Sequence, residues 1–175
     1  MIDWSGPRSH AVLLVLAGGL VAGTFDIVYA CAFWAIKASV PPSRILQSVA
    51  AGLLGPASFQ GGVRTAALGL ALHFFIAMSM SVTYYIVARR WSLLVRRPVL
   101  CGVVYGVVLY AVMNFIVIPL SSAPHGTKIS LWVVLSVAVH MFLIGLPIAL
   151  LSGRAAAETA VNVLDRATRR PAPRF

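Results

Sequence analysis

Four long apolar runs restrict the fold of this chain more than any other feature of its sequence. They cover residues 11–36, 64–88, 98–120 and 130–151 and contain almost no charge. An α-helix rises 1.5 Å per residue, so about 20 apolar residues cross the ~30 Å hydrocarbon core of a bilayer. The sequence therefore predicts four transmembrane helices.

The composition agrees with a membrane protein. Apolar residues make up 60% of the chain and charged residues 10%, against about 45–50% and about 25% in soluble domains. A net charge of +10 would indicate nucleic acid binding in a soluble protein. Here the arginines lie between the apolar runs, so membrane orientation explains them and no nucleic acid partner is expected. We predict an all-α polytopic membrane protein, with residues 1–175 forming a single membrane domain.

Prolines and glycines set the expected limits of the helices. Pro41 and Pro42 end the first helix, and Pro98 suits the first turn of the third. Pro147 should kink the fourth helix, and Gly153 should end it. The first run is too long for the apolar region of a signal peptide, which spans about 7–15 residues. We therefore expect it to be an uncleaved membrane helix.

The first linker contains the stretch SRILQSVAAGLLG, which predicts a short amphipathic helix on the outer face of the membrane. A re-entrant segment is the alternative. One side of this helix would be apolar, at Ile45, Leu46, Val49 and Leu53, and the other side polar, at Arg44, Gln47 and Ser48.

Lysine and arginine predict the orientation. The linker between the second and third spans holds Arg89, Arg90, Arg96 and Arg97, whereas the next linker holds only Lys128. Residues 154–170 are basic and read as a cytoplasmic tail helix, and residues 171–175 as a disordered end. The positive-inside rule then places both termini in the cytoplasm.

One polar residue in each span marks a candidate site. These residues are Asp26, His73, Asn114 and His140, and each lies about 9–16 Å from the outer end of its span. A charged carboxylate near the bilayer centre costs about 2.5–3.5 kcal/mol, so Asp26 must be paired, hydrated or neutral. A histidine is its natural partner. We interpret the set as a ligand-binding or proton-relay site, and hydrogen bonding between helices is the alternative.

Glycines share the helical faces of these polar residues. Small residues let the backbones of membrane helices approach closely. They are therefore expected to turn Asp26, His73 and Asn114 toward neighbouring helices, whereas the face of His140 is less clear. The expected packing glycines are Gly19, Gly23, Gly69, Gly102 and Gly106.

Four stretches carry a resemblance to a known group of proteins. They are ILQSVAAGLLGPASFQGG, ALGLALHFFIAMSMSVTYYIVAR, GVVYGVVLYAVMNFIVIPLS and VAVHMFLIGLPIAL. Over residues 11–153 the chain resembles small bacterial inner-membrane proteins of the YagU-like kind. The shared features fall on His73, on Pro119 with Leu120, and on His140. The resemblance implies a compact helical bundle in the bacterial inner membrane and implies no particular activity.

Several functions stay open at this point. The chain contains no G-x-S-x-G, H-E-x-x-H, C-x-x-C or phosphate-binding loop, so an enzyme is not expected. The favoured hypothesis is a module that binds or transports an ion, a proton or a small solute. The alternative is an accessory or assembly subunit, with the bilayer, a second copy or a larger membrane complex as partner. A third hypothesis is redox: His73 and His140 would hold a haem b, or with Asp26 a zinc or iron ion. No cofactor is otherwise indicated.

Overall fold

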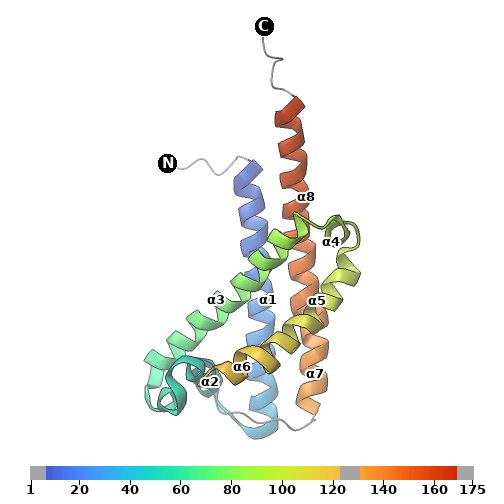
Figure 1. Ribbon diagram of the computed structural model, residues 1–175. Helices are drawn as coiled ribbons and strands as arrows, with labels where there is room; N and C mark the ends of the chain where they lie inside the picture. The colour runs from blue at the N-terminus through green and yellow to red at the C-terminus, as the bar shows by residue number, and fades with distance from the viewer. Residues whose placement is uncertain (1–6, 123–130, 169–175) are drawn as a thin grey trace.

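The chain folds into helices throughout the part that the structure describes (Figure 1). The structure is a computed structural model that describes residues 7–122 and 131–168, with side chains described for 9–122, 131–163 and 168. No strand occurs among these residues. The all-α prediction is therefore confirmed, and the predicted disordered end, 171–175, lies outside the described residues.

Four helical segments are long and apolar enough to cross a membrane: Ser9–Ala38, Gly62–Ala88, Pro98–Leu120 and Leu131–Val163. The first two lie in the uninterrupted helices α1 (Pro7–Ala38) and α3 (Gly62–Ala88). The third is α5 (Pro98–Val112), η2 (Met113–Val117) and α6 (Ile118–Leu120), and the fourth is α7 (Leu131–Val139), η3 (His140–Gly145) and α8 (Leu146–Thr168). This confirms the predicted number of helices of spanning length.

The last two helices each contain a π-helical segment, η2 and η3, shortly before a proline. Proline has no N–H, and its ring meets the carbonyl four residues earlier, so a regular α-turn cannot continue unchanged there. Just before Pro119 and Pro147 the helix widens into a π turn, and it remains helical after each proline. The disturbance expected at Pro147 therefore lies on its N-terminal side.

The fourth helix does not end where we expected. Gly153 lies inside α8, which continues to Thr168. The three alanines that follow Arg154 are strong helix formers, so they outweigh the local cost of one glycine. The tail predicted as a separate helix thus continues the fourth helix over the residues described.

The short helix predicted in the first linker is present as α2 (Pro42–Leu54), followed by the 3₁₀ helix η1 (Gly55–Gln60). One position differs from the prediction. Gln47, placed on the polar side, is buried and donates a hydrogen bond to the Gly62 carbonyl at 3.0 Å. The buried amide satisfies a backbone acceptor at the start of α3, and this outweighs apolar periodicity.

Helix α1 packs against α3 and α8, and α5 packs against α8 and η3, so the fourth helix contacts the other three (Figure 1). The start of α1, the short helix α4 (Ser92–Arg96) and the final turns of α8 lie at one end of the molecule. Helix α2 lies at the other end, beside the end of α6 (Figure 1). The basic linker and the start of the basic tail therefore share one end.

A buried polar contact joins three of these helices. The Ser81 hydroxyl on α3 donates to the Val15 carbonyl on α1 at 2.7 Å. Its oxygen lies 2.9 Å from the hydroxyl oxygen of Ser152 on α8. Both serine side chains are fully buried. Because the Ser81 hydrogen goes to Val15, Ser152 must donate to Ser81, and the contact orders all three helices.

Ser81→Ala should lower the free energy of unfolding by about 1 kcal/mol, the scale of hydrogen bonds between membrane helices. It removes the bond to the Val15 carbonyl and leaves the buried Ser152 hydroxyl without its acceptor. Ser79→Ala is the matched control, because Ser79 is exposed and its hydroxyl donates to the Phe75 carbonyl on its own helix. Denaturant unfolding in detergent measures both variants, and equal losses would contradict the interhelical role of Ser81.

Candidate functional site

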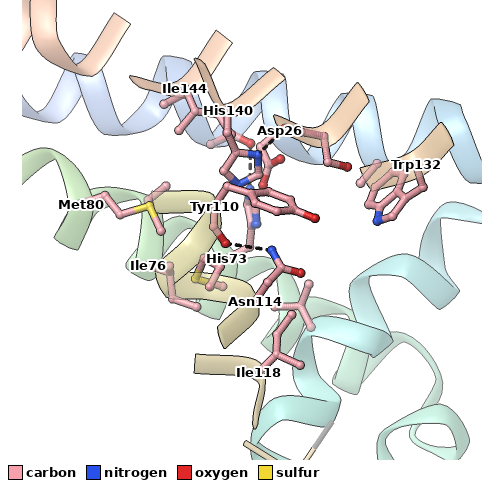
Figure 2. Close-up of a pocket in the computed structure, with 17 residues that line it drawn as sticks. Asp26, His73, Ile76, Met80, Tyr110, Asn114, Ile118, Trp132, His140 and Ile144 are labelled. Atoms are coloured by element: carbon pink, nitrogen blue, oxygen red, sulfur yellow. Dashed lines mark hydrogen bonds between the residues drawn. The ribbon is translucent and has the colours of Figure 1, made fainter. Parts of the chain in front are cut away.

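All four polar residues proposed from the sequence line one cavity (Figure 2). Its volume is about 260 Å³. Asp26 comes from α1, His73 from α3, Asn114 from η2 and His140 from η3, so each long helix contributes one of them. Residues far apart in the sequence thus meet around one space between the helices.

The remaining lining is mixed. Polar and aromatic groups come from Tyr110, Trp132 and Ser136, and apolar groups come mainly from Val49, Ile76, Met80, Met113, Ile118 and Ile144. Tyr110 and Ser136 were not singled out as site residues from the sequence. Each lies one helical turn before a predicted site residue, Asn114 or His140, and this spacing was the signal that could have identified them.

In three of the four polar residues, a side-chain N–H group donates a hydrogen bond to a backbone carbonyl. His73 Nε2 lies 2.8 Å from the Gly23 oxygen, and His140 Nδ1 lies 2.8 Å from the Ser136 oxygen. Asn114 Nδ2 donates to the Tyr110 oxygen at 2.9 Å. A carbonyl oxygen only accepts, so each bonded ring nitrogen must carry its hydrogen. The second ring nitrogen of each neutral histidine, and the side-chain oxygen of Asn114, remain as acceptors.

Asp26 has no hydrogen bond or ion pair with any side chain or backbone group in the part of the chain that the structure describes. The expected pairing with a histidine is not formed. His73 instead bonds to the carbonyl of Gly23, less than one helical turn before Asp26 on α1. The carboxylate oxygens therefore add two further acceptors to the cavity, with no internal donor assigned to them.

The π turns carry two of the site residues. Asn114 lies near the start of η2, and His140 is the first residue of η3. A π turn shifts the direction of the side chains that follow, and such turns are frequent at functional sites. The nearby prolines, Pro119 and Pro147, were the sequence signal for these irregular turns.

Glycines allow the helices around the cavity to touch through their backbones. A Cβ atom at Gly106 would overlap the carbonyl of His140, and one at Gly69 would overlap the carbonyl of Leu46 on α2. The other glycines proposed for packing also lie at close contacts: Gly102 against Leu146 and Ala149, Gly19 against Met78, and Gly23 against Phe74 and Ala77. The π turn of His140 is thus held directly against α5.

Aromatic side chains gather at the Trp132 edge of the cavity. Tyr29 stacks on Trp132 with ring centroids 5.1 Å apart, and Phe33 lies 4.8 Å from Trp132. Trp34 lies 5.4 Å from the same ring. The Tyr29 hydroxyl is 3.4 Å from the Ser136 hydroxyl. Trp34 and Trp132 therefore belong to one aromatic cluster beside the cavity.

The geometry gives little support to a metal or haem centre. Among residues 7–122 and 131–168, no three His, Cys, Asp or Glu side chains come together as a metal site. The cavity of about 260 Å³ is also below the ~300–1,000 Å³ of pockets that enclose drug-sized ligands. A haem is larger than most such ligands, so the cavity would have to enlarge to hold one.

Comparisons with protein families, curated proteins and solved structures give no match for this chain. No relative therefore supplies an activity for the cavity, and the resemblance to YagU-like proteins stays a prediction. The chemistry of the cavity must be inferred from its own side chains.

Proposed function

We propose that the protein is a multi-pass membrane protein that binds a small cation, or a proton, in this cavity and passes it through the bilayer. The observation that carries the proposal is a cavity lined by acceptors, in which the Asp26 carboxylate has no partner among the described residues. The four helices of spanning length support the membrane location. The basic end that carries α4 would face the cytoplasm, with the bacterial inner membrane as the location that the resemblance implies.

The acceptors favour a cationic occupant. An ionised carboxylate in a low-dielectric site is costly unless a positive charge or several donors compensate it. His73 and Asn114 direct N–H groups to backbone carbonyls, so they are not free to donate to Asp26 in this arrangement. A bound ammonium group would supply both the charge and the hydrogen-bond donors. A proton on Asp26 would neutralise the same carboxylate.

The volume limits the size of the occupant. A water molecule takes about 30 Å³ of liquid volume, so a cavity of about 260 Å³ holds a few waters with a small cation or one short-chain amine. His73 and His140 each keep one ring nitrogen outside the hydrogen bonds that they make to backbone carbonyls. These acceptors offer a route by which proton exchange would accompany release of the occupant. An accessory subunit without a ligand is the alternative outcome of the test.

Butylammonium should bind the purified protein in detergent and raise its melting temperature at millimolar concentration. Butan-1-ol has nearly the same size without the charge and should have a much weaker effect, because it cannot compensate Asp26. Tetrabutylammonium has the charge but exceeds the cavity and should not bind. A ¹⁹F-labelled Trp132, which lines the cavity, reports occupancy independently of stability.

Two results would contradict the proposal. Equal responses to butylammonium and butan-1-ol would show an apolar cavity in which the carboxylate plays no part. No response to either compound, together with no proton flux in liposomes, would leave the accessory role as the better interpretation.

A further inference from the structure

A second hollow lies away from the cavity, between α1, α3 and α8 toward the end of the molecule that carries α4. Its volume is about 510 Å³. The walls are mainly apolar and include Val12 and Leu16 of α1, Val82 of α3 and Val163 of α8. These four side chains are all exposed. The feature is therefore an open apolar groove on the flank of the helices.

A positively charged side chain, Arg89, lies at the edge of this groove. Arg89, the residue after α3, lines it, and its guanidinium lies 5.7 Å from the centre of the Tyr85 ring. A smaller hollow of about 330 Å³ shares Arg89, Thr159 and Val163 with the groove and extends it along α8. No carboxylate pairs with Arg89 among the side chains that the structure describes.

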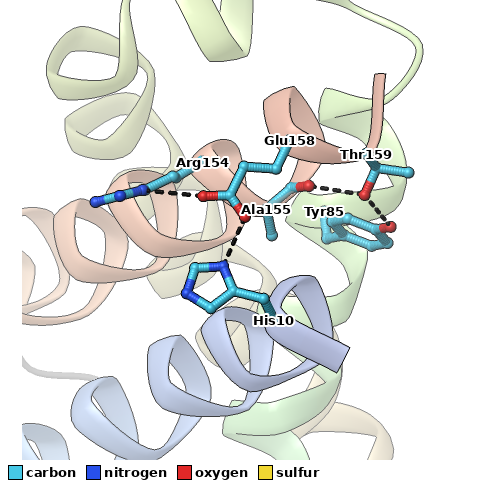
Figure 3. A network of polar contacts seen from close by, with 6 residues as sticks. All are labelled: His10, Tyr85, Arg154, Ala155, Glu158 and Thr159. Atoms are coloured by element: carbon cyan, nitrogen blue, oxygen red, sulfur yellow. Dashed lines mark hydrogen bonds and ion pairs between the residues drawn. The ribbon is translucent and has the colours of Figure 1, made fainter. Parts of the chain in front are cut away.

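The Glu158 carboxylate, near this groove, already contacts two side chains of the protein itself (Figure 3). Glu158 Oε2 lies 2.7 Å from His10 Nδ1, and Glu158 Oε1 lies 3.2 Å from Arg154 Nε. Two potential cations thus share this one carboxylate, and it makes no ion pair with Arg89. Among the described side chains Arg89 therefore has no carboxylate partner, and its charge at the groove suits an anion from outside the chain.

The hydroxyl groups on the groove wall are also satisfied internally. The Thr159 hydroxyl donates to the Ala155 carbonyl at 2.8 Å, so the contact of 3.1 Å between the Tyr85 and Thr159 hydroxyls is a bond that Tyr85 donates. Figure 3 shows this chain of contacts beside the Glu158 cluster. The groove therefore presents an apolar wall with one charged donor, the Arg89 guanidinium, which has no ion pair among the described side chains.

We propose that this groove binds an anionic phospholipid, with an acyl chain along the apolar wall and the phosphate at Arg89. The proposal rests on the membrane location proposed above and is independent of the cation cavity. A soluble phosphate would gain nothing from the apolar wall. A lipid uses both parts, and anionic lipids attract basic residues at the membrane surface.

Native mass spectrometry of the full chain in detergent tests the site, with phosphatidylglycerol and phosphatidylcholine of identical acyl chains as probes. The wild type should prefer phosphatidylglycerol by about fivefold, the effect expected for one arginine near the membrane surface. Arg89→Gln should abolish that preference. Arg90→Gln is the matched control, because Arg90 is also exposed and adjacent but does not line the groove. It should retain most of the preference.

A second variant tests the apolar part. Val82→Trp fills the groove from α3 and should weaken binding of both lipids severalfold, whereas Val107→Trp, at an exposed position of α5, should not. Equal losses in Arg89→Gln and Arg90→Gln would overturn the proposal in favour of a general basic surface. So would unchanged binding in Val82→Trp, or full competition by inorganic phosphate. Circular dichroism confirms that each variant is folded.

Discussion

Gly106→Ala should destabilise the protein by about 3 kcal/mol or more, the upper range for overpacking a close contact. The added Cβ would overlap the carbonyl of His140 and crowd the Cα of Met141. These are backbone atoms, so no side-chain rotation relieves the overlap. Helix α5 must separate from η3 instead. The same movement displaces His140, so ligand binding in the cavity should fall together with stability.

The matched control is Gly153→Ala. Gly153 is also a buried glycine inside a helix, but a Cβ there would lie 3.6 Å from the nearest atom, the Leu94 carbonyl oxygen. Alanine is favoured over glycine within a helix by about 0.8–1.0 kcal/mol. Gly153→Ala should therefore leave stability unchanged or raise it slightly. Thermal and denaturant unfolding in detergent compares the two, and a Gly106→Ala variant as stable as wild type would contradict the close contact between α5 and η3.

The large expected effect has a structural reason. Gly145 in η3 faces Gly102 and Gly106 in α5, so three glycines meet where these two segments cross. Close backbone contact is a common way for membrane helices to associate, because lipid leaves little hydrophobic driving force between them. Here the contact also fixes the π turn that begins at His140, which connects packing directly to the site.

The helices and the location of the polar residues were accessible from the sequence. Apolar length alone gave the four long helices, because each run is far longer than a typical buried core segment. Asp26 and His73 stood out because each is a rare ionisable group within a span. Similar depth in four helices was enough to expect that such groups lie near one another, and they line one cavity.

The contacts inside the site were not accessible in the same way. Depth does not specify helix rotation, so it could not show that His73 bonds to the Gly23 carbonyl and leaves Asp26 unpaired. The position of Gln47 depends on its hydrogen bond to the Gly62 carbonyl on another helix. The periodicity of apolar residues within α2 carries no information about that contact. The π turn at His140 depends on Pro147 together with the packing of α5. Each of these features is set by contacts between helices.

Asp26→Asn should weaken butylammonium binding by about 10- to 100-fold while leaving the fold intact. A hydrogen bond to a charged group contributes about 1.5–3 kcal/mol, and each 1.4 kcal/mol corresponds to a factor of ten in the dissociation constant. Asn keeps the size of the side chain but removes the negative charge and one acceptor. The same variant should reduce cation or proton flux in reconstituted liposomes to near the background of empty liposomes.

Stability distinguishes this result from general damage. Asp26 makes no hydrogen bond or ion pair within residues 7–122 and 131–168, so replacing it with asparagine breaks no such bond there. It also removes the cost of placing a charge in an apolar environment. Asp26→Asn should therefore be as stable as wild type in the absence of ligand, or slightly more stable, although it binds poorly.

The matched control is Thr24→Val, which removes a polar group from an exposed position on the same helix, two residues away and outside the cavity lining. It should retain both binding and flux. A loss of stability in Asp26→Asn would instead indicate that the carboxylate serves as a contact between helices, and unchanged flux would exclude it from the pathway. Binding lost while stability is retained is the combination expected of a residue kept unpaired for a ligand, because a structural contact would lose both together.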